Sequence, residues 1–245
     1  MVNLVIAMPV YNEEEGIVNF LEDIETNFVN ISHQIIVIDD CSKDLTTKFI
    51  NDYINLKDNK NISLLINSQN LGHGPSTLIA LNQAILLNPE FIMSVDGDGQ
   101  FKTIEMLKMY LELENNNISI IEGVRVGRND PWYRRMISSM TKLIVFVKCG
   151  VVVKDPNTPL RIYTLEVLTK LLPRVPIKSI VPNLIISIIS RKDKHTIIYQ
   201  KVQSLHRRGS QKIGSTWAGS RVNLPSFKLI RFCIKALSDL LFKSF

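Results

Sequence analysis

The sequence is poor in cysteine and has no long uncharged apolar run. Its three cysteines, Cys41, Cys149 and Cys233, are odd in number and lack metal-ligand spacing, which excludes a disulfide framework and argues against a zinc site. No stretch reaches the roughly 18 uncharged apolar residues that a membrane-spanning helix needs. The N-terminus runs into apolar residues without a basic region, so we expect no secretory signal and a reducing, cytoplasmic setting.

Arginine is missing from the first 120 residues. They contain 17 acidic residues and six lysines, a net charge of −11, whereas residues 121–245 contain six acidic residues and 23 lysines and arginines, a net charge of +17. The chain of 245 residues is 45% hydrophobic and 21% charged, which suits one globular domain and excludes a disordered chain. The basic half predicts an anionic partner: a phosphorylated substrate, a phospholipid surface or nucleic acid. A solvated basic surface is the alternative.

Short apolar runs alternate with longer amphipathic segments. We predict strands at 4–8, 35–38, 62–66, 91–95 and 196–202, and helices at 13–28, 74–87, 132–147, 164–172 and 181–190, with one more after Asp44. Fully apolar strands that alternate with helices indicate an α/β fold, a mostly parallel sheet with helices on both faces. His33, at the start of the second strand, is expected to be an ordinary surface or capping residue.

Polar residues follow the first four predicted strands at the point where each ends. The four clusters are residues 11–13, 39–42, 70–73 and 96–100. Because the carboxyl ends of parallel strands share one edge of an open sheet, and ligands bind at that edge, we expect the clusters to form one site.

The most specific cluster is Asp96-Gly97-Asp98-Gly99-Gln100. Two carboxylates separated by one small residue can reach one hard cation, and Mg²⁺ or Mn²⁺ accepts such oxygen ligands together with diphosphate oxygens. Gln100 can add an amide oxygen. Turn chemistry or a helix cap also produces Asp-x-Asp, but its place after an apolar strand in this series favours a metal–diphosphate site.

Two further clusters can contact a nucleoside. Residues 9–13, Pro-Val-Tyr-Asn-Glu, offer an aromatic face and a carboxylate for a base and a ribose, and Asp39 and Asp40 follow the second strand. Ordinary strand-to-helix turns, with Asn12 and Asp44 as helix caps, are the alternative.

These motifs, together with Asn-Leu-Gly-His-Gly at 70–74, resemble family 2 glycosyltransferases of the GT-A fold. The resemblance covers residues 2–130 and implies inverting transfer from a UDP- or GDP-sugar with a divalent metal. By this resemblance the nucleotide contacts are Pro9, Tyr11, Glu13, Asp39, Asp40 and Asp96, and the metal ligands are Asp96, Asp98 and Gln100.

The second half is similar to the dolichyl-phosphate mannose synthase and polyprenyl-phosphate sugar transferase group. The similarity lies in Gly-Val-Arg at 123–125, Arg134-x-x-x-Ser138 and Asp-Pro-Asn-Thr-Pro-Leu-Arg-Ile-Tyr at 155–163. It implies that Arg125, Arg134 and Ser138 contact the acceptor phosphate, which suits a guanidinium fork. Surface solubility is the alternative reason for such arginines.

The same group carries a basic loop, Arg-x-x-Gly-x-Ser-Lys, that closes over the diphosphate. Its counterpart here runs from His206 to Lys212, with His206 in place of the arginine and Gln211 in place of the serine. The resemblance therefore implies that Lys212 and His206, or Arg207 and Arg208 in its place, neutralise the diphosphate.

The resemblance implies that the acceptor is a polyprenyl phosphate, undecaprenyl or dolichyl, with a hydroxyl of a growing capsule or lipopolysaccharide glycan as the alternative. A phosphate is already ionised, whereas a hydroxyl needs a carboxylate to take its proton. Asp155 is the plausible base in residues 131–245, which lack the acidic pair of many hydroxyl-directed relatives. The basic half therefore favours a phosphate acceptor, with Asp98, Arg125 and Asp155 as the expected catalytic residues. A non-catalytic nucleotide-sugar-binding module does not need the Asp-x-Asp motif, and nucleic-acid binding does not explain it.

Residues 1–224 are expected to form one GT-A domain, with a nucleotide-binding half at 1–122 and an acceptor-binding half at 123–224. Residues 225–245 predict a basic amphipathic helix with a wide apolar face, which is typical of a helix on an anionic membrane surface. Docking on the sheet or on a second copy is the alternative. We therefore expect a peripheral protein at the inner face of the membrane.

Overall fold

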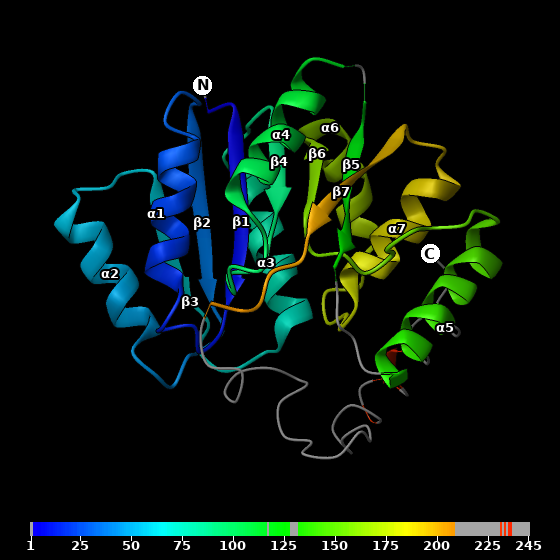
Figure 1. The fold of residues 1–245 in the computed structure, drawn as a ribbon, viewed down its shortest axis with the longest axis horizontal. Coiled ribbons are helices and arrows are strands. Elements are labelled where there is room, and N and C mark those ends of the chain that lie inside the picture. Colours follow the sequence, from blue (N-terminus) through cyan, green and yellow to red (C-terminus); the bar gives the residue numbers. More distant parts are fainter. Residues whose placement is uncertain are drawn as a thin grey trace.

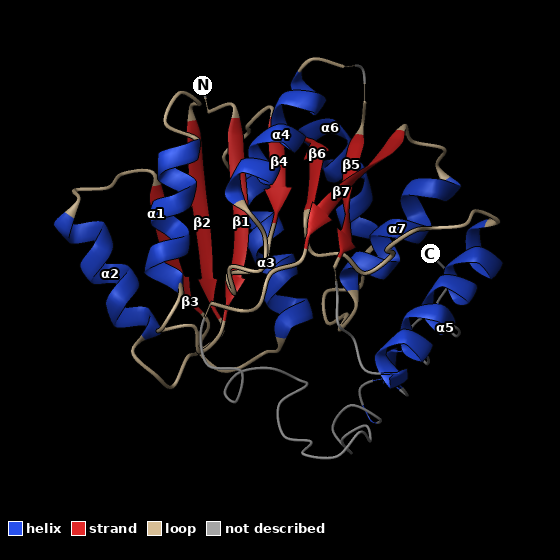
Figure 2. Ribbon diagram, in the orientation of Figure 1, coloured by secondary structure: helices blue, strands red, loops and turns tan. Residues whose placement is uncertain are grey.

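The computed structural model describes residues 2–116, 118–127 and 132–208, together with Arg231, Cys233, Lys235 and Ala236, and leaves out the side chain of Arg134. Within these residues the chain forms a seven-stranded sheet of order β3-β2-β1-β4-β6-β5-β7 (Figure 2). The strands are β1 (Leu4–Val10), β2 (His33–Asp39), β3 (Ile62–Ile66), β4 (Phe91–Ser94), β5 (Ile120–Val126), β6 (Arg161–Thr164) and β7 (Ile197–Gln203). All neighbours are parallel except β6, which runs antiparallel to β4 and β5. The predicted α/β class and mostly parallel sheet are confirmed.

Helices cover both faces of the sheet (Figure 1). They are α1 (Ile17–Asn27), α2 (Thr46–Leu56), α3 (His73–Leu86), α4 (Thr103–Glu114), α5 (Trp132–Cys149), α6 (Leu165–Leu171), the short η1 (Leu172–Arg174) and α7 (Pro182–Lys192). Helices α1, α2 and α4 share one core cluster with Leu4, Ile6 and Met8, whereas α3, α6 and α7 share the other with Val5 and Ala7. Successive strand side chains point to opposite faces, so a strand between two helical layers must be apolar at every position.

Strand β1 continues through Pro9, although the sequence predicts that it ends before this proline. The pairing of β1 with β4 stops at Ala7, opposite Ser94. Pro9 is paired with Ile38 of β2, but its backbone polar groups face the β4 side, beyond the last pair with β4, so its missing N–H removes no hydrogen bond from either pairing. Its carbonyl accepts the N–H of Gly97 (3.2 Å), which ties the end of β1 to the loop after β4.

The predicted C-terminal amphipathic helix is described at four residues only. All four are helical; Arg231 and Lys235 are exposed, and Ala236 is buried in the same core cluster as α3, α6 and α7. The rest of residues 209–245 lies outside the described part. No helix in the described part has both the length and the apolar character needed to cross a membrane.

Candidate functional site

The four polar clusters lie together at the carboxyl edge of β1, β2 and β4, where the arrowheads in Figure 1 end. Two contacts join neighbouring clusters: the Asn12 N–H donates to Ser42 Oγ (3.0 Å), and His73 Nε2 lies 3.6 Å from Asp96 Oδ1. The Gly97 N–H donates to the carbonyl of Pro9 (3.2 Å), two residues before the first cluster. The predicted convergence of these clusters is therefore present in the fold.

Asp40 builds one wall of this edge. One carboxylate oxygen accepts the N–H of Leu71 and the other accepts the N–H of Gly72, both at 2.8 Å. Gly72 has a φ of +92°, which favours glycine and brings His73 to the start of α3 beside Asp96. Asp40 thus fixes the 70–73 loop, and its contact with a nucleoside stays a prediction.

Asp39 organises the neighbouring turn. Its carboxylate accepts the N–H (3.0 Å) and the hydroxyl (2.5 Å) of Ser42, and also the hydroxyl of Thr47 on α2. The side chain is fully buried, whereas Tyr11 at the end of β1 is half-buried. Pro9, Tyr11 and Asp39 thus lie at one edge of the sheet. Their contacts with a nucleoside stay predictions.

Asp98 sits where negative charge is concentrated. Burial, together with the charges of Asp96 and Glu13, raises the pKa of Asp98 to about 8. Gly97 leaves no space for a side chain, because a Cβ there would lie 2.3 Å from Val10 Cγ1. A divalent cation within reach of both aspartates would relieve this repulsion, and carboxylate oxygens are what Mg²⁺ and Mn²⁺ prefer.

The cation would need ligands beyond the two aspartates. Among the described residues, no three His, Cys, Asp or Glu side chains are grouped so that they could hold one metal ion. The amide of Gln100 and the oxygens of a diphosphate are the remaining donors of suitable chemistry. The residues present therefore fit a metal that binds together with its diphosphate ligand.

The segment after β7 returns to this edge. Its backbone N–H groups at Leu205 and Arg208 donate to the carbonyls of Gln100 (2.9 Å) and Asp98 (3.1 Å). A Cβ at Gly99 would lie 2.5 Å from the Arg208 side chain, so this glycine allows the close approach. Two of the residues predicted to serve the diphosphate, Arg207 and Arg208, are thus beside the Asp-x-Asp loop.

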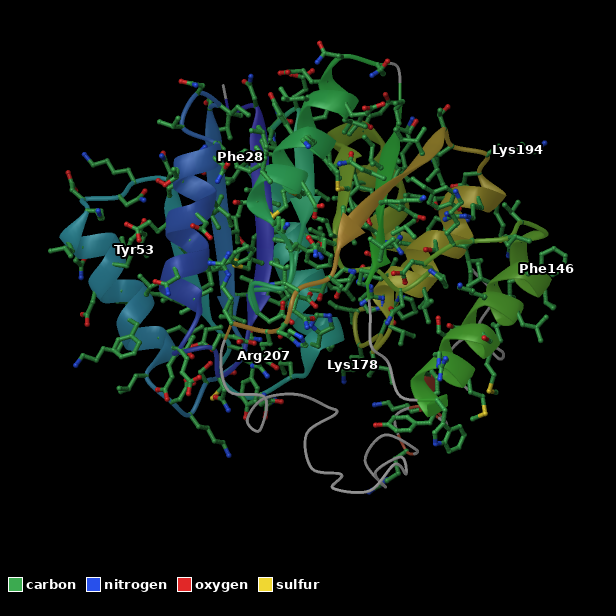
Figure 3. All side chains as sticks on the ribbon, viewed as in Figure 1. Phe28, Tyr53, Phe146, Lys178, Lys194 and Arg207 are labelled. Carbon is green, nitrogen blue, oxygen red and sulfur yellow. The ribbon has the colours of Figure 1, made fainter. Side chains whose placement is uncertain are left out.

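Arg207 is engaged with Glu13 (Figure 3 labels Arg207 at this edge). Its Nε donates to Glu13 Oε2 (2.9 Å), and its Nη2 donates to Glu13 Oε1 and to the Asn12 carbonyl (3.0 Å). Burial raises the pKa of Glu13, although Arg207 opposes that rise. His206 is exposed and Lys212 lies outside the described residues, so the predicted diphosphate contacts stay predictions.

On the acceptor side, Arg125 at the end of β5 faces Asp155. Arg125 Nε lies 2.8 Å from Asp155 Oδ2 and Nη2 lies 2.9 Å from Oδ1. The side chains are only 17% and 11% exposed. Ser138 is half-buried on α5, whereas the side chain of Arg134 lies outside the described residues. Two of the predicted catalytic residues therefore form one ion pair.

A buried ion network joins Glu122, Arg161 and Arg191, and no motif in the sequence predicts it. Both Arg161 and Arg191 bind the carboxylate of Glu122, with closest distances of 2.9 and 2.6 Å. The three residues are 0%, 9% and 1% exposed, respectively. The signal in the sequence is a charged residue inside an apolar run, Ile-Ile-Glu-Gly-Val and Leu-Arg-Ile-Tyr. Charged side chains are almost never fully buried unless they are paired with an opposite charge.

A protein-family model described as glycosyl transferase family 2 matches residues 5–171. A dolichyl-phosphate beta-glucosyltransferase of Dictyostelium discoideum is 27% identical over 193 residues, covering 71% of this chain and 58% of that protein. An undecaprenyl-phosphate 4-deoxy-4-formamido-L-arabinose transferase of Proteus mirabilis is 25% identical over 169 residues, covering 68% and 50%. An uncharacterized protein of Methanocaldococcus jannaschii is 30% identical over 149 residues, covering 59% and 63%. The chain thus spans between half and two thirds of the length of these relatives.

Solved structures share the fold at low sequence identity. The glucosyl-3-phosphoglycerate synthase of Mycobacterium tuberculosis in complex with UDP matches with a TM-score of 0.68 and 16% identity, covering 98% of this chain and 79% of that one. Residues 1–349 of S. aureus TarS match with a TM-score of 0.57 and 20% identity, covering 84% and 60%. The arrangement of strands and helices is therefore that of the GT-A fold.

Proposed function

The chain belongs to glycosyltransferase family 2, and we propose that it moves a sugar from a UDP- or GDP-sugar to an undecaprenyl or dolichyl phosphate, with inversion at the sugar carbon. The observation that carries the choice of acceptor is the ion pair between Arg125 and Asp155. A hydroxyl acceptor needs a free carboxylate as its base, and here both oxygens of the candidate base are engaged by the Arg125 guanidinium. A phosphate acceptor needs no base. The names of two relatives, which refer to undecaprenyl and dolichyl phosphate, support the same choice.

The donor would bind across the ends of β1, β2 and β4. Asp96 and Asp98, with Gln100, would hold Mg²⁺ or Mn²⁺, which when bound would neutralise charge on the diphosphate. Arg207 and Arg208 lie beside the same loop, with their guanidinium groups paired to Glu13 and Asp23. On donor binding they would have to leave these carboxylates to add positive charge where the nucleoside diphosphate departs.

Arg125 would orient the acceptor phosphate opposite the leaving group. A phosphate oxygen attacks the sugar carbon while the bond from that carbon to the diphosphate breaks, so the configuration inverts. No proton is transferred in this step. Asp155 acts by fixing the guanidinium of Arg125, since both of its carboxylate oxygens are engaged there.

The exposed side chains of helix α5 favour an anionic membrane surface as a partner. It exposes large apolar side chains at Trp132, Met136, Met140, Leu143, Phe146 and Val147. Arg135 and Lys142 on the same helix are also exposed, and Figure 3 shows Phe146 on the side of α5 away from the sheet. Exposed apolar and basic residues on one helix are typical of an interfacial helix, and a lipid acceptor resides in the membrane.

The test is a transfer assay. UDP- and GDP-sugars are screened with Mn²⁺ or Mg²⁺, with and without undecaprenyl phosphate, and both nucleoside-diphosphate release and organic-extractable sugar are measured. We expect lipid-linked sugar with one donor, and loss of that product in Asp98→Asn. Asp155→Asn should keep measurable turnover, because no base is removed. Transfer to a glycan hydroxyl with none to any polyprenyl phosphate would overturn the proposal.

A further inference from the structure

Arg161 is the largest of the fully buried side chains described. It lies at the start of β6, opposite Glu122 of β5 and Ser94 of β4. Ser94 is the last residue of β4 and lies two residues before Asp96, and Glu122 is three residues before Arg125. Arg161 therefore sits between the donor and acceptor sides of the predicted site.

Arg161 grips the turn formed by residues 155–158. Its Nη2 donates to the Pro156 carbonyl (2.7 Å) and its Nε donates to the Thr158 carbonyl (3.0 Å). The turn is closed by the Thr158 N–H, which donates to the Asp155 carbonyl (3.3 Å). Through these bonds the position of Asp155 depends on a guanidinium that never reaches the surface.

The same turn holds Arg125 in two ways. Asp155 binds two nitrogens of its guanidinium, and the Asn157 carbonyl lies 3.4 Å from Nη2. If residues 155–158 moved, the Arg125 guanidinium would therefore lose its present orientation. Displacements on the scale of an ångström far from the reacting atoms are enough to weaken a site.

A buried ion network contributes little net stability to a fold. Removing charges from water costs several kcal/mol per ion, and well-packed apolar residues often replace such networks without loss. Glu122 neutralises two arginines, and both also contact Ser187, whose hydroxyl accepts from Arg161 (2.8 Å) and donates to the Pro156 carbonyl (3.0 Å). Arg191 donates to the Ser187 carbonyl and to the Tyr199 hydroxyl, so it makes no direct bond to the turn. The two arginines thus share burial and counter-ion, and only Arg161 binds the turn.

We propose that Arg161 is a positioning residue for the acceptor site, holding the 155–158 turn so that Asp155 orients Arg125 toward an anionic acceptor. The proposal rests on the phosphate acceptor proposed above. It adds a role for a residue that contacts neither substrate. It also makes Arg191 a matched control.

The test measures binding of farnesyl phosphate, a water-soluble polyprenyl phosphate, to the full chain by titration calorimetry. We expect Arg161→Lys to weaken binding roughly tenfold, as expected when a binding group is misdirected. Arg191→Lys should change binding less than about twofold, because it breaks no direct bond to the turn and leaves the Ser187 hydroxyl in place. In the Arg125→Ala background, Arg161→Lys should have no further effect, since Arg161 acts through Arg125.

Asp155→Asn provides a second variant if Arg161→Lys does not fold, as judged by circular dichroism. Simple electrostatics predicts tighter binding of an anion when a nearby carboxylate is neutralised, whereas loss of orientation predicts weaker binding. Equal losses in Arg161→Lys and Arg191→Lys, additivity with Arg125→Ala, or tighter binding in Asp155→Asn would each overturn the role of Arg161. If the wild-type chain fails to bind farnesyl phosphate, the proposed acceptor falls first, and this inference with it.

Discussion

Glu13 accepts two hydrogen bonds from the guanidinium of Arg207, which is 194 residues further along the chain. The side chains of both residues are about nine-tenths buried, at 9% and 10% exposed. The pair joins the end of β1 to the segment that follows β7. The candidate donor edge is therefore completed by a segment that is distant in the sequence. Local sequence patterns do not predict that this segment lies there.

Replacing Arg207 by Met should destabilise the protein by about 3 kcal/mol, because it leaves a buried carboxylate without its counter-charge. The free energy of unfolding in urea measures the loss. Glu13→Gln combined with Arg207→Met should recover most of it, since no unpaired charge remains. A double variant as unstable as Arg207→Met alone would show that the pair is not the cause.

Metal binding should be linked to pH through Asp98. The pKa of Asp98 is raised to about 8 from 3.8, so the folded protein retains a proton that the unfolded chain releases. Stability from this group is complete below about pH 3.8 and is lost as the pH rises through 8. A divalent ion needs the ionised carboxylate, so its affinity should rise over the same range.

Thermal unfolding between pH 5 and 9, with EDTA or with Mn²⁺ and UDP, measures both effects. We expect the metal-free midpoint to fall toward pH 8 and the stabilisation by Mn²⁺ and UDP to grow. Asp98→Asn should flatten both trends. Equal stabilisation by Mn²⁺ and UDP at pH 5.5 and pH 8 would contradict the linkage.

The donor edge was predictable from the sequence because its information is local. Each of the four polar clusters directly follows an apolar run, and parallel strands bring their carboxyl ends to one edge whatever their order. The bounds of β3, at Ile62–Ile66, and the start of α5, at Trp132, are as predicted. The sequence predicts that β1 ends before Pro9, because a local pattern does not show where the neighbouring strand β4 ends.

The acceptor side was not predictable in the same way. Strand β6 is only four residues long and begins with Arg161, so the apolar run around it is too short and too interrupted to predict a strand. Its burial depends on Glu122, 39 residues earlier, which also binds Arg191, 69 residues later. Pairing over such separations leaves no periodic pattern. The family motif at 155–163 located this region, but not the contacts within it.

His33 shows the same limit, since the sequence predicts a surface or capping residue and the structure buries it at 7% exposed. Its Nδ1 and Nε2 lie 2.9 Å from the Ile31 carbonyl and from Glu25 Oε1, and both are acceptors. Burial disfavours the imidazolium, but these bonds outweigh it and raise the pKa of His33. The hydrogen bond from His33 lowers the pKa of Glu25.

These shifts predict a window of maximum stabilisation. The contribution of His33 is complete below about pH 6.5 and is lost as the pH rises through its raised pKa, whereas that of Glu25 is complete above about pH 4.5 and is lost in acid. His33→Gln should therefore lower the unfolding midpoint by roughly 2–4 °C at pH 5.5 and by less at pH 8.5. Glu25→Gln should show the same difference in unfolding midpoint between the two pH values. The double variant should lose no more than either single variant. A loss independent of pH would rule out the charged pair.

Helix α5 should bind anionic vesicles through its apolar face. Leu143 and Val147 are 62% and 74% exposed and lie one helical turn apart. Replacing both by Glu removes apolar area and adds repulsion, so sedimentation with phosphatidylglycerol vesicles should fall at least about tenfold. Binding of the wild-type chain should also weaken with salt, because Arg135 and Lys142 contribute electrostatically.

Leu56 offers the matched control, since it is 84% exposed on α2, at the opposite end of the molecule from α5 (Figure 1). Leu56→Glu adds one negative charge to an exposed leucine, as Leu143→Glu alone does on α5, so these two single variants are the matched pair. Leu56→Glu should leave vesicle binding unchanged if the membrane meets α5. An equal loss in Leu56→Glu would mean that net charge alone governs binding. Unchanged binding in the α5 variant would move the membrane contact elsewhere on the chain. Because a polyprenyl phosphate presents its headgroup at the membrane surface, contact through α5 would bring the proposed acceptor close to Ser138 on the same helix.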